Sequence, residues 1–74
     1  MKTRVAFDRE FLHAVKVRGL TIGELAQRAR LSPATASAAV HGKRVNVRSA
    51  VLLARTLASC PVITELEEWV ARND

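Results

Sequence analysis

Signals for the start and the end of short helices recur along the whole of this 74-residue chain. The residues whose side chains can cap a helix start are Asp8, Thr21, Ser32 and Asn46. The residues that end helices are Gly19, Gly42 and Pro61. The stretch between one such signal and the next leaves room for a helix of a few turns. The one stretch that alternates between apolar and polar residues, Val45–Val47, is too short to anchor a sheet. We therefore predict an all-α fold, a compact bundle of about five short helices, in a single domain over residues 1–74.

The first predicted helix follows the cap residue Asp8. Phe7 and Leu12 stand at the spacing of a hydrophobic staple, which fixes the entry of the chain into a helix. The residues expected on the inward face are Phe11, Leu12, Ala14 and Val15. His13 falls on the polar side of the helix, and we expect it to be exposed.

Two further helices are predicted after residue 46. The inward residues of the first, which Asn46 caps, are Ala50, Leu53, Ala54 and Leu57. The apolar stripe of the second, over about residues 62–72, is Val62, Ile63, Leu66, Trp69 and Val70. We expect Trp69 to pack in the core against the first or fourth helix, and Cys60 to be a small buried hydrophobe. Leu52 projects outward, and together with the apolar last helix it indicates a homodimer interface.

Charge is distributed very unevenly along the chain. Residues 1–59 carry eleven of the twelve Lys and Arg residues but only three of the seven acidic ones. Residues 60–74 carry the other four acidic residues and one Arg. A basic field of this kind attracts polyanions, with nucleic acid first and an acidic membrane surface second.

Several classes of protein are disfavoured by what the sequence lacks. No apolar run approaches the ~18 residues of a membrane span, and no signal-peptide pattern opens the chain. The single cysteine cannot form an internal disulfide, which fits a cytoplasmic protein. His13, His41 and Cys60 lack the spacing of zinc ligands. No nucleophile–base pair, carboxylate pair or glycine-rich phosphate loop is present, so we expect neither an enzyme nor a bound cofactor, and no small-molecule effector is evident.

The middle of the chain carries the most specific pattern. Thr21 and Glu24 form the T-x-x-E capping box that starts one helix, and a turn of about three residues leads to Ser32 and Pro33, which start the next. The stretch Leu20–Leu57 reads LTIGELAQRARLSPATASAAVHGKRVNVRSAVLLARTL. It resembles the helix-turn-helix of the phage Cro and cI-repressor (lambda repressor-like) family, with the helix-turn-helix at about residues 21–41. The segment TIGELAQRARLSPATAS also resembles the head of lac-repressor-type regulators.

Two positions depart from the family pattern. Arg30 stands where the family usually has glycine in the turn, and in a left-handed conformation it costs about 1–2 kcal/mol, which a phosphate contact could offset. Ala36 and Ala39 replace the usual branched apolar residues of the second helix, so this helix must pack closer or rely on neighbours such as Leu53.

The resemblance implies that the second helix of the motif lies in the major groove of DNA. Ala36, Ala39 and Val40 are expected to face inward, which leaves a small, uncharged outer face. The expected base-contacting residues are Ser32, Pro33, Ala34, Ser37, Ala38 and His41. The expected phosphate-contacting residues are Thr21, Arg30, Thr35, Lys43, Arg44 and Arg48. Lys2 and Arg4 could form an arm on the DNA backbone or in the minor groove. Because the helix lacks Asn, Gln, Arg and Lys, we expect modest specificity per half-site.

The function that follows is sequence-specific binding of double-stranded DNA. The resemblance implies a small transcriptional regulator, a repressor that occupies two operator half-sites as a homodimer. Two alternatives stay open. One is an antitoxin or anti-activator that binds a protein through the last helix and the acidic tail, and the other is an excision factor that bends DNA.

Overall fold

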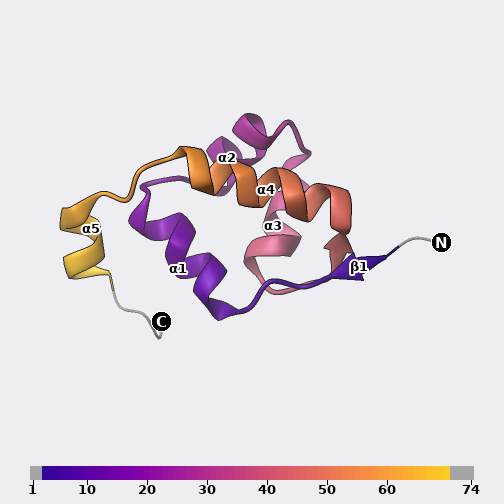
Figure 1. Cartoon of the computed structure of the whole chain (residues 1–74), viewed down its shortest axis with the longest axis horizontal. Helices are drawn as coiled ribbons and strands as arrows, with labels where there is room; N and C mark the ends of the chain where they lie inside the picture. The colour runs from indigo at the N-terminus through magenta and orange to yellow at the C-terminus, as the bar shows by residue number, and fades with distance from the viewer. Residues whose placement is uncertain (1–2, 71–74) are drawn as a thin grey trace.

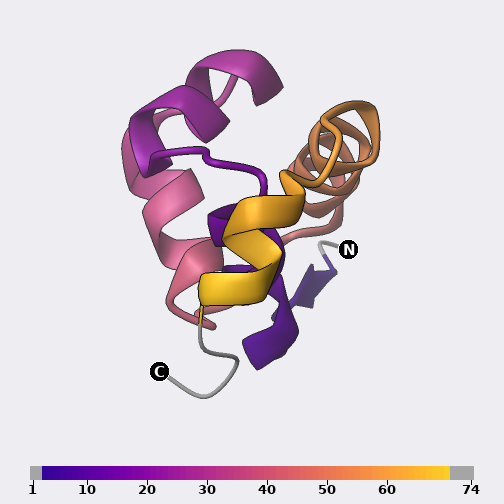
Figure 2. The same cartoon turned by 90° about the vertical axis from the view of Figure 1, so that its left-hand side faces the viewer.

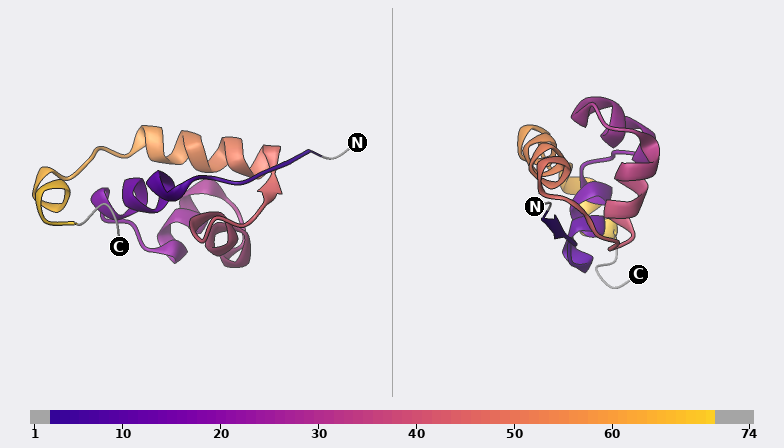
Figure 3. Two further views of the ribbon diagram at one scale, coloured as in Figure 1. Left: turned by 90° about the horizontal axis from the view of Figure 1, so that it is seen from below. Right: turned by 90° about the vertical axis from the view of Figure 1, so that its right-hand side faces the viewer.

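The structure, a computed structural model, describes residues 3–70. Its elements in chain order are β1 (Arg4–Val5), α1 (Arg9–Val17), α2 (Ile22–Ala29), α3 (Pro33–Val40), β2 (Val45–Asn46), α4 (Val47–Ser59) and α5 (Thr64–Trp69). The all-α prediction is confirmed, and a two-residue antiparallel ribbon is added to it, with Arg4 opposite Asn46 and Val5 opposite Val45. Figure 1 shows β1 at one end of the molecule and α5 at the other, and the views of Figure 3 agree.

The first four helices start where their capping residues predict. The side chains of Asp8, Thr21, Ser32 and Asn46 each accept a hydrogen bond from a backbone N–H of the first turn. Ile63 is the N-cap residue of α5, and its side chain makes no capping hydrogen bond. The start of α5 therefore depends on a tertiary contact, in which the N–H of Ile63 donates to the carbonyl oxygen of Val17 at 2.8 Å.

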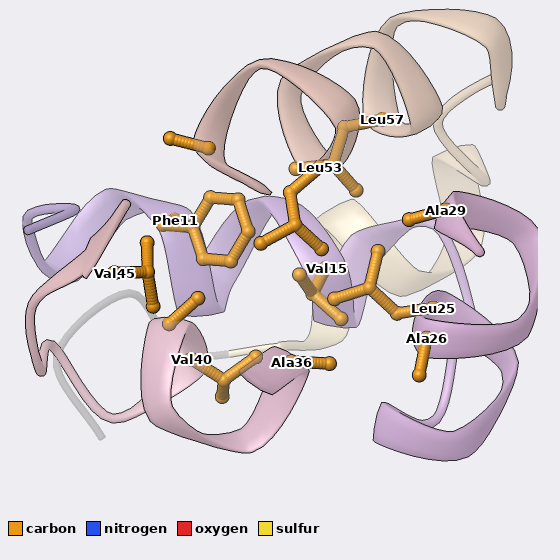
Figure 4. Close-up of a cluster of buried hydrophobic side chains, with 12 residues drawn as sticks. Phe11, Val15, Leu25, Ala26, Ala29, Ala36, Val40, Val45, Leu53 and Leu57 are labelled. Carbon is orange, nitrogen blue, oxygen red and sulfur yellow. The ribbon is translucent and has the colours of Figure 1, made fainter. Parts of the chain in front are cut away.

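The core lies where α1, α2, α3 and α4 meet, as the close-up in Figure 4 shows. Leu25 of α2 and Leu53 of α4 are completely buried at its centre. Around them the buried side chains of α2 and α3 are mostly alanine: Ala26, Ala29, Ala36 and Ala39. The small side chains let the helix axes approach closely, and α2 packs against both α3 and α4.

Arg18 joins the end of α1 to the end of α4. Its Nε donates to the carbonyl oxygens of Leu57 and Cys60 at 2.9 and 3.0 Å, and one terminal guanidinium nitrogen donates to Ala14 at 2.9 Å. A cation beside the last carbonyls of a helix is favourable, because the C-terminal end of a helix carries partial negative charge. This residue fixes the place at which the chain turns from α4 toward α5.

Five sequence predictions about burial are wrong. Trp69, expected in the core, is 84% exposed, because α5 packs on α1 through other residues and buries none of its own completely. Ala54 is exposed, whereas Leu52, expected to project outward, is half-buried against the core. His13, expected to be exposed, is only 5% exposed. Cys60 is half-buried rather than buried.

The last helix is shorter than predicted. α5 covers Thr64–Trp69, Val62 and Ile63 lie before it and are partly exposed, and the predicted end at about residue 72 lies outside the described residues.

His13 is expected to destabilise the fold. Both ring nitrogens are buried without a hydrogen-bond partner among the described residues, and each such group costs about 1–3 kcal/mol. His13→Leu should therefore raise the free energy of unfolding by about 1 kcal/mol or more, which corresponds to about 4–8 °C in melting temperature for a domain of this size.

The measurement is thermal and urea unfolding, with His13→Ala as the control. The alanine variant removes the same nitrogens but leaves a cavity, so it should be less stable than the leucine variant. A leucine variant less stable than the wild type would show that the buried imidazole is paired.

Candidate nucleic-acid interface

α2 and α3 are joined by a tight turn of three residues, Arg30 to Ser32. Arg30 is left-handed, with φ 61° and ψ 43°. The N–H of Leu31 donates to the carbonyl oxygen of Ala26 at 2.9 Å, and that of Arg30 donates to Gln27 at 3.2 Å. This pair of bonds is the Schellman arrangement, which satisfies the last carbonyls of a helix and turns the chain sharply. α3 therefore starts in a direction that the turn determines.

The same turn ends α1 and α3, with glycine at the left-handed position. Gly19 has φ 71° and Gly42 has φ 77°. Arg30 is the one non-glycine residue with positive φ in the described part of the chain. The left-handed conformation costs arginine conformational free energy that it does not cost glycine. The Arg30 side chain is therefore a candidate for a role outside folding.

The start of α2 is held by a complete capping box. The N–H of Thr21 donates to Oε1 of Glu24 at 3.0 Å, and the N–H of Glu24 donates to Oγ1 of Thr21 at 3.1 Å. These bonds, with a smaller contribution from Arg28, hold the pKa of the Glu24 carboxyl below its usual range. Thr21, a predicted phosphate contact, is exposed, but its hydroxyl oxygen is already used as a cap.

α3 presents one buried and one open side. Ala36, Ala39 and Val40 are buried, as the sequence predicts. Of the six residues predicted to contact bases, those exposed are Ser32, Pro33, Ala34 and His41. Ser37 and Ala38 are half-buried, and Ala38 packs partly against the core. The open face is therefore narrower than predicted, and it is widest at the start of the helix.

A hollow lies beside this face, between α3 and the start of α4. The residues that line it are Arg4, Ala34, Thr35, Ala38, Arg44, Val45, Asn46 and Ser49. The β1–β2 pairing brings Arg4 here, because it sets Arg4 opposite Asn46. The sequence indicated an arm at Lys2 and Arg4 but no strand, and Lys2 lies outside the described residues. Thr35 is half-buried, and its hydroxyl is hydrogen-bonded to that of Ser32 at 3.0 Å.

His41 ends α3 with a defined ring orientation. Its Nδ1 lies 2.8 Å from the carbonyl oxygen of Ser37 and 3.3 Å from the Ser37 hydroxyl. A carbonyl oxygen only accepts, so this contact places a proton on Nδ1. In the neutral ring Nε2 is then a hydrogen-bond acceptor, which suits an amino group on a base edge.

The four predicted phosphate-contacting cations are all exposed: Arg30, Lys43, Arg44 and Arg48. The structure divides them into two groups. Lys43 and Arg44 follow α3, and Arg44 lines the hollow that Arg4 also lines. Arg30 and Arg48 line a second hollow between α2 and α4, together with Arg28 and Arg55. The last two were not singled out as site residues, although the seven-residue spacing of Arg48 and Arg55 on a helix is a readable signal.

Between residues 3 and 70, no three His, Cys, Asp or Glu side chains lie close enough together to hold a metal ion. In that same range no helix has both the length and the apolar character needed to cross a bilayer.

Comparisons with protein families, with curated proteins and with solved structures found no match for this chain. The resemblance to the Cro and cI-repressor family thus stays a prediction based on the residues quoted above.

Arg30→Gly should stabilise the protein. Glycine adopts the left-handed conformation without the penalty that arginine pays, but it also gains freedom in the unfolded chain. We expect a net rise of about 0.5–1 kcal/mol in the free energy of unfolding, measured by urea denaturation. Gly42→Arg is the matched reverse change, and it should lower stability by about 1 kcal/mol. No atom lies closer than 3.9 Å to a Cβ added at Gly42, so this cost is one of backbone conformation. A loss of stability in Arg30→Gly would contradict the account of the turn.

The charge of Glu24 should contribute to stability only above its lowered pKa. A carboxyl group with a lower pKa in the folded protein than in the unfolded chain stabilises at neutral pH, and this contribution is lost as the pH falls through the folded-state pKa. Glu24→Gln keeps the capping hydrogen bond without the charge. Wild type should therefore be the more stable at pH 7, and the difference should shrink as the pH falls below the ordinary pKa of a glutamate and vanish once the pH is below the lowered folded-state pKa. A difference independent of pH would show that the carboxylate charge has no role.

Proposed function

We propose that this protein is a sequence-specific double-stranded DNA-binding regulator of the cytoplasm, a small repressor that occupies an operator as a homodimer. The observation that supports it best is the two-sided character of α3. Three residues of this helix bury its inner side, while the outer side around Ala34 is exposed and uncharged. Exposed cations stand before the helix, at Arg30, and after it, at Lys43 and Arg44.

The major groove of B-form DNA is wide enough for an α-helix, and its phosphates line both edges. With the start of α3 in the groove, Pro33 and Ala34 can contact thymine methyl groups. Ser32 offers a hydroxyl near the bases, and Nε2 of His41 can accept from a base amino group. The helix supplies no side chain for two simultaneous hydrogen bonds to one base, so each half-site is read with modest specificity.

The cations on either side of α3 are suited to hold the two edges of the groove. Arg30 and Arg48 lie at the α2–α4 side, and Arg44 lies with Arg4 beside the β1–β2 ribbon. Contacts with phosphate position the helix but carry no sequence information. The strained backbone of Arg30 is then offset by its phosphate contact, which explains an arginine where glycine folds better.

Ala34→Glu tests the position of α3. Ala34 is exposed, so the fold should be unaffected, but a carboxylate in the groove is repelled by the phosphates. Affinity for the operator, found by selection from random duplex DNA, should fall at least about tenfold, a loss of about 1.4 kcal/mol. The matched control is Ala54→Glu, the same change at an exposed alanine of α4. Equal affinities for the two variants would overturn the proposal.

The salt dependence of binding tests the phosphate contacts. About five contacts per protomer should give a slope near −4 to −5 for log K against log salt concentration. Lys43→Gln and Arg44→Gln should each reduce the magnitude of the slope by about 1 and weaken binding to all sequences alike. A flat slope would favour the protein-binding alternative, in which the basic field is not used for DNA.

A further inference from the structure

A groove between α2 and α4 concentrates positive charge. We call it the arginine groove, and its lining residues are Arg28, Ala29, Arg30, Arg48, Leu52, Arg55, Thr56 and Ser59. Four of these eight residues are arginines, and no acidic residue lines the hollow. Like charges gathered at one place repel each other, so an anionic occupant would reduce the electrostatic repulsion among the four arginines.

The rest of the lining points to an occupant with both an apolar part and an N–H donor. Leu52 gives the groove an apolar floor and is only half-buried. The Thr56 hydroxyl donates to the carbonyl oxygen of Leu52 at 2.8 Å, and the Ser59 hydroxyl donates to that of Thr56 at 2.8 Å. With their protons used, both hydroxyl oxygens can only accept. A phosphodiester has no donor and no apolar surface to offer them, whereas a peptide segment has both.

The same chain carries a segment with these properties, on α5. The acidic residues Glu65, Glu67 and Glu68 are all exposed, and Trp69 is 84% exposed. The inner side of the helix is already used, because Ile63 and Leu66 lie over Gly19 at the end of α1. The outer side therefore combines negative charge with a large apolar ring whose indole N–H needs an acceptor.

We propose that α5 of a second copy lies in the part of the arginine groove nearest Ser59, and that two copies exchange this contact reciprocally about a two-fold axis. Carboxylates of α5 would pair with Arg28 and Arg55, and Trp69 would cover Leu52. This inference deepens the homodimer that is part of the proposed function by naming its contact, and it does not require that the protein bind DNA.

The order of the elements along the chain favours a reciprocal arrangement. Ser59 is the last residue of α4, and α5 starts five positions later at Thr64, so the end of the groove and the helix lie at the same end of the molecule (Figures 1 and 2). A two-fold axis near this end brings each α5 to the groove of the other copy and closes the assembly.

The lengths of the two elements also agree with partial occupancy. The groove follows α4 from Arg48 to Ser59, about 16 Å, and the six residues of α5 extend about 9 Å. α5 would thus cover only the half around Arg55. Arg30 and Arg48, at the other half, would stay open for the operator.

Charge reversal on each side of the contact tests the proposal without DNA. Arg55→Glu and Glu68→Lys should each weaken self-association of the full chain about tenfold or more in sedimentation velocity. An equimolar mixture of the two variants should associate again, because each reversed side then meets its opposite charge. Arg9→Glu, at an exposed arginine outside the groove, is the control for the change in net charge and should associate like the wild type.

Trp69 supplies a second readout, since it is the one tryptophan of the chain. Its emission should shift to shorter wavelength as the protein concentration rises, and the shift should be absent in Arg55→Glu. A wild type that stays monomeric, or variants that associate as well as the wild type, would overturn the proposal. If Arg55→Glu associates as well as the wild type but binds DNA more weakly, the groove is a phosphate-binding site instead. The outcome of the Ala34→Glu experiment, measured separately, bears only on the proposed function.

Discussion

The close approach of α2, α3 and α4 is the constraint on which the rest of this structure depends. The chain has few aromatic residues to fill an interior, so two leucines, Leu25 and Leu53, occupy the centre, and alanines bring the helices together around them. A domain of this size is stable by only a few kcal/mol, and removing a buried leucine side chain costs about 2–5 kcal/mol. The position of α3, and with it the whole candidate interface, therefore rests on very few side chains.

The parts of the fold that the sequence predicts well are those that local chemistry decides. A capping side chain such as Thr21 acts within one helical turn, and the left-handed residues Gly19, Arg30 and Gly42 act within the last turn of the helix before them. The buried side of α3 was predictable for the same reason, because helical periodicity alone assigns Ala36 and Ala39 to one face.

The parts that were missed depend on contacts between distant residues. Trp69 belongs to an apolar stripe, but α5 is placed by Arg18 and Val17 at the end of α1, and that placement leaves the indole outside. His13 is buried together with Phe11 and Val15, each two positions away. A spacing of two does not place residues on one face of a helix, so helical periodicity could not predict this burial. The grouping of Arg28 with Arg55 could not be predicted from the sequence for the same reason. These two residues become neighbours only because α2 packs on α4.

The β1–β2 ribbon has a consequence for how the molecule opens. It pairs Arg4 with Asn46, 42 positions apart in the chain, and Val5 with Val45, 40 positions apart, and it consists of two residues on each side. A pairing this short recovers little of the entropy lost on closing so large a loop, so β1 should separate from β2 more readily than α2, α3 and α4 separate from one another. Arg4 can then leave its hollow and return at little cost to the core. The position of Arg4 beside α3 therefore depends on a pairing that should open and re-form within the native state while the helices stay packed.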